Sequence, residues 1–441
     1  MYTVTVGLEI HAELKTATKM FCACRNNPNE REPNRNVCAV CLAHPGTLPA
    51  INKEAVRKVL LVGKAVGGEV ADYTEFDRKN YFYPDIPKGY QISQYKFPLV
   101  QGGSLAGVQL TRIHLEEDTA RSQHSGEKSL VDYNRAGVPL MELVTEPVIR
   151  SAEQAGTFAR ELQLLLRTLG AGEANMEKGE MRVEANISVS KDSSLGTKVE
   201  VKNLNSFRSV ERAIAFETER QSRVLEAGQE VVQETRGWDE AKQETFSQRK
   251  KEGSADYRYF PDPDLPSLRL SEVAEFQNLE LPELPWQKRE RYLGLGFLQK
   301  QDVEQLLLDA PLADFFNQVM EQLDSVELKK SAANYILNDV AGIRKNTPAW
   351  LPDRDVFIRA LTLPSPQAKS SIASGVLTEV VDDSALPAIA QAVIDGNPKV
   401  VAEYRAGKEA AMQFLVGQGM KLSKGSANPQ ALKEAIQKNL G

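Results

Sequence analysis

The stretch Val4-Thr-Val-Gly-Leu-Glu-Ile-His-Ala-Glu13 opens the chain and sets the pattern from which its fold can be worked out. Apolar side chains recur at every second position: Val4, Val6, Leu8 and Ile10. Polar side chains stand between them: Thr5, Glu9, His11 and Glu13. Because successive side chains of a strand point to opposite faces, this alternation predicts a half-buried strand with Glu9 and His11 on its solvent side.

Two further stretches, 182–189 and 198–202, repeat this alternation of apolar and charged or amide residues. Strands with one apolar and one polar face suit an antiparallel sheet with a wet side. Two helical stretches interrupt them, one from Ser151, where Gln154 completes a capping-box pattern, to Gly170, and one from Phe207 to Gly228. The pattern predicts an α+β fold.

Proline-rich segments at 260–266 and 282–285 mark the end of the strand patterns, and helical periodicity follows them. We expect a catalytic domain over residues 1–285, a helical domain over 286–365 and a small all-α tail domain over 366–441. In the tail, Asn428 is the expected N-cap of a last helix that begins at Pro429. From Asn397 onward seven basic residues face three acidic ones, a local net charge of +4 in a chain of net charge −6. A basic tail in an acidic chain suits contact with nucleic acid.

The 441 residues have an ordinary content of apolar and charged residues, which excludes a disordered, collagenous or coiled-coil chain. The N-terminal residues show no basic segment followed by an apolar stretch and a cleavage site, and no apolar run is long enough for a membrane helix. We therefore expect a cytoplasmic protein with no membrane partner. In that reducing compartment the four cysteines stay free for metal binding or catalysis.

All four cysteines fall into two short knuckles, Cys22-Ala-Cys24 and Cys38-Ala-Val-Cys41. Four thiolates are what tetrahedral zinc requires, and the loop between the knuckles has few apolar residues of its own. The pattern favours a structural zinc site, with four free buried thiols as the alternative. A catalytic zinc is disfavoured, because a complete shell of thiolates leaves no open position for water or substrate.

Carboxylates and histidines gather at three places: Glu9 with His11, the run Arg112-Ile-His-Leu-Glu-Glu-Asp118, and Glu142 inside an apolar stretch. Burying Glu142 unpaired would be expensive, so we expect a cation beside it, either Arg, Lys or a metal ion. Several carboxylate oxygens suit Mg²⁺, which bridges phosphate oxygens in phosphoryl transfer. Two roles remain open for His11, as a ligand of Mg²⁺ or Mn²⁺ or as a donor to phosphate. Taken singly, each acid also fits a solvated carboxylate or a structural ion pair.

Two segments fit nucleotide or phosphate binding. Residues 78–91 alternate aromatic side chains with cations, a pattern that either stacks a base or forms a packed loop. Lys202, Asn205 and Ser206 precede the second long helix, where backbone N–H groups can cradle phosphate. Because the chain contains neither a P-loop nor a Gly-x-Ser-x-Gly nucleophile elbow, an ATP site would be of another kind and hydrolytic acyl chemistry is poorly supported.

Many motifs together resemble the B subunits of the tRNA-dependent amidotransferases, over essentially the whole chain. The resemblance includes the cysteine quartet and the following stretches: Gly7-Leu-Glu-Ile-His11, Phe76-Asp-Arg-Lys-Asn-Tyr-Phe-Tyr-Pro-Asp85, Ile113-His-Leu-Glu-Glu-Asp118, Asp132-Tyr-Asn-Arg-Ala-Gly137, Lys202-Asn-Leu-Asn-Ser-Phe207, Gln233-Glu-Thr-Arg-Gly-Trp238, Asp256-Tyr-Arg-Tyr-Phe-Pro-Asp262, Asn397-Pro-Lys399 and Phe414-Leu-Val-Gly417.

This resemblance implies a ligase of protein biosynthesis that converts Glu-tRNA(Gln), Asp-tRNA(Asn) or both into the amide. It implies that the chain uses ATP and Mg²⁺ to phosphorylate the side-chain carboxylate of the aminoacyl group. Ammonia from a glutaminase A subunit then displaces the phosphate, and a small C subunit completes a heterotrimer. It also implies a cradle-like antiparallel sheet, a helical domain and a tail that grips tRNA.

Carried over by position, the resemblance assigns the metal and phosphoryl-transfer site to Glu9, His11, Glu117 and Glu142, with Glu116 as a substitute for Glu117. The expected Mg²⁺ ligands are His11, Glu117 and Glu142, and the expected pocket-lining residues are Lys79 and Tyr81. The zinc cysteines, which some family members lack, look structural: Cys22, Cys24, Cys38 and Cys41.

Two features depart from the family pattern. Glu184 stands where the family usually has aspartate, so the role of that carboxylate is open. Gly417 and Gly419 lie close together in the tail, where either close approach to an RNA backbone or a break in the helix would explain them.

Two other functions remain as alternatives. The chain could be a non-catalytic RNA scaffold, in which zinc and the basic tail only position tRNA and no ATP is consumed. The carboxylates could instead form a two-metal nuclease or phosphatase site that needs Mg²⁺ and no ATP.

Overall fold

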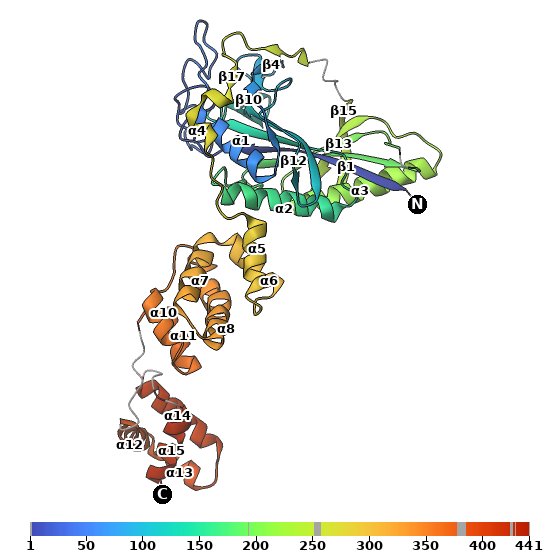
Figure 1. Cartoon of the computed structure of the whole chain (residues 1–441). Coiled ribbons are helices and arrows are strands. Elements are labelled where there is room, and N and C mark those ends of the chain that lie inside the picture. The colour runs from blue at the N-terminus through green and yellow to red at the C-terminus, as the bar shows by residue number, and fades with distance from the viewer. Residues whose placement is uncertain are drawn as a thin grey trace. The chain divides into compact units, whose positions relative to one another are not determined.

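The computed structural model describes residues 2–192, 194–250, 257–376, 385–423, 427 and 429–440. It divides into two compact units, one up to Gln287 and one from Lys288. The first unit holds the sheets, and the second is helical (Figure 1). The predicted α+β class is confirmed. The finer division into domains at residues 286 and 366 stays a prediction.

A ten-stranded sheet forms the centre of the first unit. Its strands are β1 (Thr3–Glu13), β2 (Glu69–Val70), β6 (Val100–Gln101), β7 (Ser104–Leu105), β8 (Val108–Glu117), β11 (Pro139–Thr145), β12 (Met181–Ser190), β13 (Val199–Leu204), β14 (Glu234–Asp239) and β15 (Glu244–Lys250). Along the sheet they follow the order β15-β14-β13-β12-β1-β11-β8-β6-β2, with β7 beside β8. Neighbouring strands are antiparallel as expected, except that β13 and β14 run parallel.

Three smaller sheets contain the other described strands. They are β4 (Asp77–Asn80) with β5 (Tyr90–Ser93) and β16 (Phe260–Pro261), β9 (Arg121–Ser125) with β10 (Lys128–Asp132), and β3 (Tyr73–Thr74) with β17 (Leu268–Arg269). The β4–β5 pair carries the aromatic segment. The pairing of β16 with β4 brings residues near Phe260 beside it.

The opening strand alternates as the sequence predicts. Val6, Leu8 and Ile10 are at most 1% exposed, and Glu9 and His11 lie on the opposite, partly accessible face. The same alternation in β12 buries Val183, Ala185 and Ile187. One face of the sheet is therefore core, and the other carries the polar groups.

Helices α2 (Ala152–Thr168) and α3 (Phe207–Glu226) lie along the core face (Figure 1). Helix α2 begins after Ser151, whose hydroxyl accepts from the Gln154 N–H, and the Gln154 side chain accepts from the Arg150 N–H. This differs from the usual capping box, in which the returned bond comes from the N-cap itself. Helix α1 (Lys53–Ala65) packs near β8, and η2 (Leu270–Glu272) and α4 (Ala274–Gln277) complete the unit.

Helix α5 (Pro285–Gly294) spans the division between the units. The helices after it are α6 (Lys300–Leu308), α7 (Ala310–Gln322), α8 (Val326–Asn334), the π-helical segment η3 (Tyr335–Val340), α9 (Ala341–Arg344), α10 (Arg354–Ala360), α11 (Ser365–Ser374), α12 (Leu386–Gly396), α13 (Pro398–Arg405), α14 (Ala410–Leu422) and α15 (Pro429–Leu440). Among the described helices, none has the length and apolar character needed to cross a bilayer.

The last helices share a core of their own, in which Leu415, Leu432 and Ile436 are fully buried. Helix α14 runs without interruption through Gly417 and Gly419, so the two glycines do not break the helix. A Cβ at Gly419 would lie 2.6 Å from Leu432 Cδ2, which shows that this glycine permits close packing of α14 on α15. Gly417 is exposed with open space beside it. The predicted N-cap Asn428 lies outside the described residues.

Candidate active site and metal centre

The polar face of the sheet forms a cavity of about 670 Å³ lined by carboxylates, histidines and cations. His11 on β1 pairs with Glu142 on β11, and Glu142 pairs with His114 on β8. Directly opposite residues of antiparallel strands have Cβ atoms only about 5 Å apart. Strand register alone therefore assembles a row of three functional side chains from distant parts of the sequence.

Short contacts join this row to Glu116. His11 Nε2 lies 3.4 Å from Glu116 Oε1 and 3.4 Å from Glu142 Oε2. His114 Nε2 lies 3.2 Å from the same Glu142 oxygen. Burial alone would lower the pKa of His11, but its hydrogen bonds to Glu116 and Glu142 outweigh this and raise that pKa well above its usual value. Without a metal ion, His11 is thus the cation between two carboxylates.

Cationic side chains also reach these buried acids. Lys79 Nζ lies 3.6 Å from Glu116 Oε2, and Arg112 Nη2 lies 3.6 Å from Glu142 Oε1. Burial opposes ionisation of Glu116, but Lys79 and His11 dominate and lower its pKa to about 2. Burial likewise opposes ionisation of Glu142, whose pKa the two histidines hold well below its usual range. Both acids stay charged at neutral pH, and Arg112 is a partner of the kind that the sequence leads one to expect for Glu142.

A second group of carboxylates lies further along the same cavity. Glu9 pairs with Glu184 across β1 and β12, and Lys202 Nζ lies 2.8 Å from Glu184 and 3.9 Å from Glu200. Burial raises the pKa of Glu9, and the nearby charges of Glu142 and Glu184 raise it further. Glu184, the residue that departs from the family pattern, therefore forms part of the cavity wall.

The donor set of this cavity fits a divalent cation. Glu9, His11 and Glu142 place ligand atoms within 4.8 Å of one another, as do His114, Glu116 and Glu142. Among the described residues, the buried Glu116 Oε2 accepts no hydrogen bond. Carboxylate oxygens with one imidazole suit Mg²⁺ or Mn²⁺. Glu142 belongs to both groups, which makes it the central ligand of the candidate metal site.

Glu117 is not part of this cavity, although the resemblance places it among the metal ligands. Neighbouring residues of β8 point to opposite faces, so Glu116 faces His11 and Glu117 faces away. The Glu117 carboxylate lies 2.6 Å from Lys88 Nζ and accepts a hydrogen bond from the Ile92 N–H. The structure thus places Glu116, the substitute weighed from the sequence, beside His11, and the expected set of His11, Glu117 and Glu142 stays a prediction.

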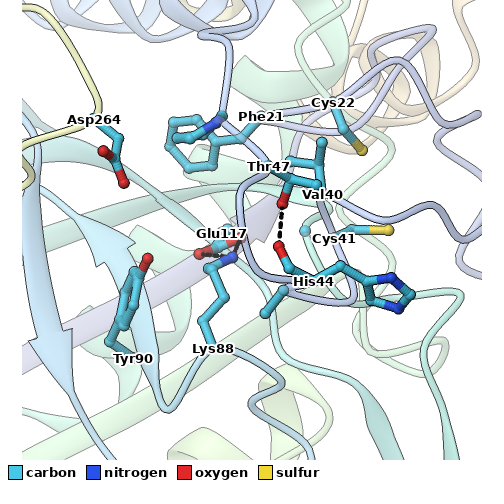
Figure 2. A pocket seen from close by; sticks show the side chains of 13 residues that line it. Phe21, Cys22, Val40, Cys41, His44, Thr47, Lys88, Tyr90, Glu117 and Asp264 are labelled. Carbon is cyan, nitrogen blue, oxygen red and sulfur yellow. Dashed lines mark hydrogen bonds and ion pairs between the residues drawn. The ribbon is translucent and has the colours of Figure 1, made fainter.

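Glu117 and Lys88 instead line a separate cavity of about 170 Å³ beside the cysteines. Figure 2 shows Lys88 joined to Glu117 in this cavity, with Tyr90 next to Lys88 and with Cys22 and Cys41 further off. The alternation Ile113, Leu115, Glu117 against His114, Glu116 is readable in the sequence, and it is the signal that separates the two glutamates.

Lys79 lines the large cavity. Tyr81 does not line it, but its ring contacts that of Tyr257, which does. Tyr81 stacks on Tyr83 with ring centroids 5.7 Å apart and meets Tyr257 edge-on at 6.1 Å. Tyr257 and Tyr259 line the cavity together with Tyr95, and Lys79 Nζ lies 5.3 Å from the centre of the Tyr257 ring. Reasoning from the sequence missed these two tyrosines as site residues, because they lie more than fifty positions beyond Lys202 in the chain.

The expected phosphate cradle is only partly at the cavity. Lys202 lines it, but Asn205 is exposed and does not line it. Ser206 is the N-cap of α3 and accepts a hydrogen bond from the Ser209 N–H. The Glu240 carboxylate accepts from the Ser209 hydroxyl at the same helix end. A protein carboxylate thus already lies where an anion would approach this helix.

The four cysteines come together as the spacing predicts. The sulfur atoms of Cys22, Cys24, Cys38 and Cys41 all lie within 4.8 Å of one another. Sulfur atoms bound to one zinc ion at about 2.3 Å lie roughly 3.8 Å apart, so the arrangement fits tetrahedral zinc. In the thiol form, Cys22 donates to Cys41, whose pKa falls to about 5 although burial opposes this.

Polar contacts and one buried lysine hold the cysteine loop. Lys19 is fully buried, and its Nζ lies 3.8 Å from Cys41 Sγ and donates to the Tyr133 carbonyl at 3.1 Å. The Asn134 side chain accepts from the Asn36 N–H and donates to the Glu32 carbonyl. These contacts replace an apolar core in this loop.

Comparison with known proteins identifies the class to which this fold and site belong. Residues 4–275 match the model of the GatB/GatE catalytic domain, and residues 354–440 match that of the GatB domain. The first match alone covers more than half of the chain. The chain therefore belongs to the GatB family.

Relatives that match over nearly their full length show which amidotransferase subunit this chain is similar to. The chain is 41% identical to the B subunit of the aspartyl/glutamyl-tRNA(Asn/Gln) amidotransferase of Thermus thermophilus, with all of both chains covered. It is 42% identical to the B subunit of the amidotransferase of the same name from Herpetosiphon aurantiacus, over 100% of this chain and 99% of that one. The B subunit of the chloroplastic/mitochondrial glutamyl-tRNA(Gln) amidotransferase of rice is 41% identical, over 100% of this chain and 88% of that one.

Proposed function

We propose that this chain is the component of a tRNA-dependent amidotransferase that activates the mischarged amino acid with ATP. Relatives that match this chain over essentially their full length are named as B subunits of the aspartyl/glutamyl-tRNA(Asn/Gln) amidotransferase. The substrate is Glu-tRNA(Gln), Asp-tRNA(Asn) or both. The side-chain carboxylate attacks the γ-phosphate of ATP and releases ADP, and ammonia then displaces the phosphate from the acyl phosphate to form the amide.

The observation that carries this proposal is the cluster of His11, Glu116 and Glu142 on the polar face of the sheet. Phosphoryl transfer between a carboxylate and ATP brings two anions together, so positioned cations must offset their repulsion. Lys79, Arg112 and Lys202 stand in the same cavity and supply positive charge to it. Its volume of about 670 Å³ is large enough to hold the reacting groups of both substrates.

Glu116, Glu142 and His11 would hold the magnesium ion, with Glu9 next to them. When bound, Mg²⁺ would supply positive charge that offsets the negative charge of the phosphate groups. The proton that His11 holds between Glu116 and Glu142 would leave before the imidazole could ligate a metal, because a ligating nitrogen must be unprotonated. His114 holds Glu142 in place through its contact of 3.2 Å.

The other activities belong to partners. The sequence carries no Gly-x-Ser-x-Gly elbow, and we infer that ammonia comes from a glutaminase A subunit, with a small C subunit completing the heterotrimer. The tail over residues 366–441 would bind tRNA through exposed basic residues such as Lys399, Arg405 and Lys433. A protein that acts on aminoacyl-tRNA works in the compartment where translation occurs, which here would be the cytoplasm. The cysteine quartet would hold a structural zinc ion, because four thiolates leave no place for substrate.

The experiment is an assay of the assembled complex with the substitution Glu142→Ala. We expect acyl-phosphate formation on mischarged tRNA to be lost while glutaminase activity persists, because only this chain loses a ligand. Unaltered amidation would overturn the proposal. A complex that consumes no ATP would favour an RNA scaffold, and tRNA cleavage in Mg²⁺ without ATP would favour a nuclease.

A further inference from the structure

Lys19 is a fully buried lysine that the proposed mechanism does not use. Its Nζ lies 3.8 Å from Cys41 Sγ and donates to the Tyr133 carbonyl at 3.1 Å. The other lysine that is buried in the described part of the chain, Lys58, lies 3.3 Å from the carboxylate of Glu54. Among the described residues, no carboxylate forms such an ion pair with Lys19. Its ammonium therefore lacks the counter-charge that a buried cation usually has.

The cysteine quartet supplies this charge once it holds zinc. A buried charge without an opposite charge is costly, and a neutral thiol is only a weak acceptor. Four thiolates around one Zn²⁺ ion, in contrast, carry together about two negative charges, because the charge of the ion offsets only half of theirs. The contact between Lys19 and Cys41 thus suits a loaded zinc site better than four free thiols.

The surroundings of Lys19 hold its ammonium at the cysteines. The Lys19 N–H donates to the Cys24 carbonyl at 2.9 Å, and the Asn52 side chain donates to the Lys19 carbonyl at 3.1 Å. The aliphatic stem passes Gly137, where an added Cβ would lie 3.6 Å from Lys19 Cδ and 3.7 Å from Cys41 Cβ. Backbone contacts and close packing therefore fix the position of this side chain, so its charge lies beside the metal site without a change of conformation.

Tyr133, the second partner of Lys19, contacts two other segments. Its N–H donates to Asn34 Oδ1 in the cysteine loop at 2.7 Å, and its hydroxyl donates to the Pro84 carbonyl in the aromatic segment at 2.9 Å. The ammonium of Lys19 therefore joins the cysteine quartet to a residue that contacts both the cysteine loop and the segment 78–91.

We propose that Lys19 is a positioning residue of the zinc site, whose buried ammonium offsets the negative charge of the four zinc-bound thiolates and so raises the affinity for zinc. The inference rests on the proposed structural zinc site and adds to it a group beyond the four ligands. Residues that contact the ligands of a metal typically alter its affinity by roughly 10–100-fold.

Zinc titration of the full chain tests this role. Lys19→Met keeps an unbranched side chain and removes the charge. We expect it to weaken zinc binding about 10-fold or more, measured in competition with a chromophoric chelator. The Tm of the zinc-free chain should not fall, because the variant removes a buried charge that lacks a partner in that state.

Lys58→Met is the matched control. Lys58 is also buried and donates to a carbonyl, that of Gly170, at 2.7 Å, but its counter-charge is Glu54. We expect zinc affinity in this variant to stay within about twofold of the unaltered chain, because Lys58 shares no partner with the cysteines.

A spectrum of the chain loaded with Co²⁺ in place of zinc separates charge compensation from a merely structural role. Loss of a positive charge beside Cys41 raises the energy of the thiolate electrons. The thiolate-to-cobalt charge-transfer band should therefore move to longer wavelength in Lys19→Met and stay in place in Lys58→Met. If Lys19→Met does not fold, Lys19→Gln carries the same predictions, because it removes the charge and keeps a donor for the Tyr133 carbonyl.

The outcomes are distinct. Unchanged zinc affinity in the Lys19 variant would overturn the proposal, and so would an unshifted cobalt band. An equal loss of zinc affinity in Lys58→Met would show a general effect of removing a buried lysine and would also overturn it. Failure of the unaltered chain to bind zinc would instead overturn the proposed zinc site.

Discussion

His11 Nε2 lies 3.4 Å from Glu142 Oε2, and strand pairing places the two residues directly opposite each other. Because an antiparallel sheet fixes this pairing, the contact does not depend on a loop conformation. Two candidate metal groups share Glu142, so this carboxylate is the one that a bound cation would need most.

Glu142→Gln should therefore weaken binding of Mn²⁺, used as a probe for Mg²⁺, by about tenfold or more, or ~1.4 kcal/mol. The amide keeps the shape of the side chain and removes its charge. Electron paramagnetic resonance of free Mn²⁺ measures the change. Unchanged Mn²⁺ affinity would show that the cation binds elsewhere.

Glu116→Gln and Glu117→Gln form a matched pair on one strand. We expect the first to lower kcat for amidation at least ~10-fold, because it removes the carboxylate that His11 and Lys79 contact. The second should leave Mn²⁺ affinity unchanged, since Glu117 lies with Lys88. Steady-state kinetics and Mn²⁺ titration of both variants test this expectation. A larger loss in Glu117→Gln than in Glu116→Gln would indicate that Glu117 is the metal ligand.

Removal of zinc should destabilise the first unit. A metal held by Cys22, Cys24, Cys38 and Cys41 replaces apolar packing in their loop, so its binding energy contributes to folding. A strong chelator should lower the Tm by ~5 °C or more, and added zinc should restore it. Absence of zinc from the purified protein by elemental analysis would contradict this account.

Glu13 makes stability depend on pH. Burial, and after it the charge of Asp118, together raise the pKa of Glu13 to about 7. The protonated form is favoured in the folded protein, so this contribution is complete below the unfolded pKa of about 4.5 and is lost as pH rises through about 7. Glu13→Gln should remove this loss, a relative gain on the order of 1–3 kcal/mol at pH 8. Urea unfolding at pH 5 and pH 8 measures it, and parallel pH profiles of both proteins would contradict it.

The two glycines of α14 should respond oppositely to alanine. Gly419→Ala should destabilise the tail by about 1–3 kcal/mol, because its methyl group would lie 2.6 Å from the fully buried Leu432. Gly417→Ala should stabilise it by about 0.5–1 kcal/mol, because the position is open and alanine favours helix. Thermal unfolding compares them. A loss of tRNA affinity in Gly417→Ala without loss of stability would indicate close approach of RNA at that position.

Much of the fold could be predicted from local sequence patterns. The alternation in β1 and the capping residues of α2 depend on neighbours in sequence, so both elements could be predicted from it. The parallel pairing of β13 with β14 could not be predicted from the sequence, because it depends on the path of the chain after α3. Similarly, Tyr257 reaches the cavity only through the pairing of the nearby strand β16 with β4.

The site was less predictable than the fold. Resemblance favoured Glu117 over Glu116, and only the faces of β8 distinguish two adjacent glutamates. The fully buried Lys19 beside Cys41 could not be predicted either, since lysine is usually exposed and its partner follows 22 positions later. Charged groups that pair across distant segments need the folded structure to be recognised.

The most direct test of the central claim is trapping of the activated amino acid. The complete complex is incubated with Glu-tRNA(Gln), ATP, Mg²⁺ and hydroxylamine, without glutamine or ammonia. We predict ADP release together with the γ-glutamyl hydroxamate, formed when hydroxylamine displaces phosphate from the acyl phosphate, and neither product with Glu142→Gln. Absence of hydroxamate with the unaltered complex, or its formation at an equal rate with Glu142→Gln, would contradict the assignment of phosphoryl transfer to this site.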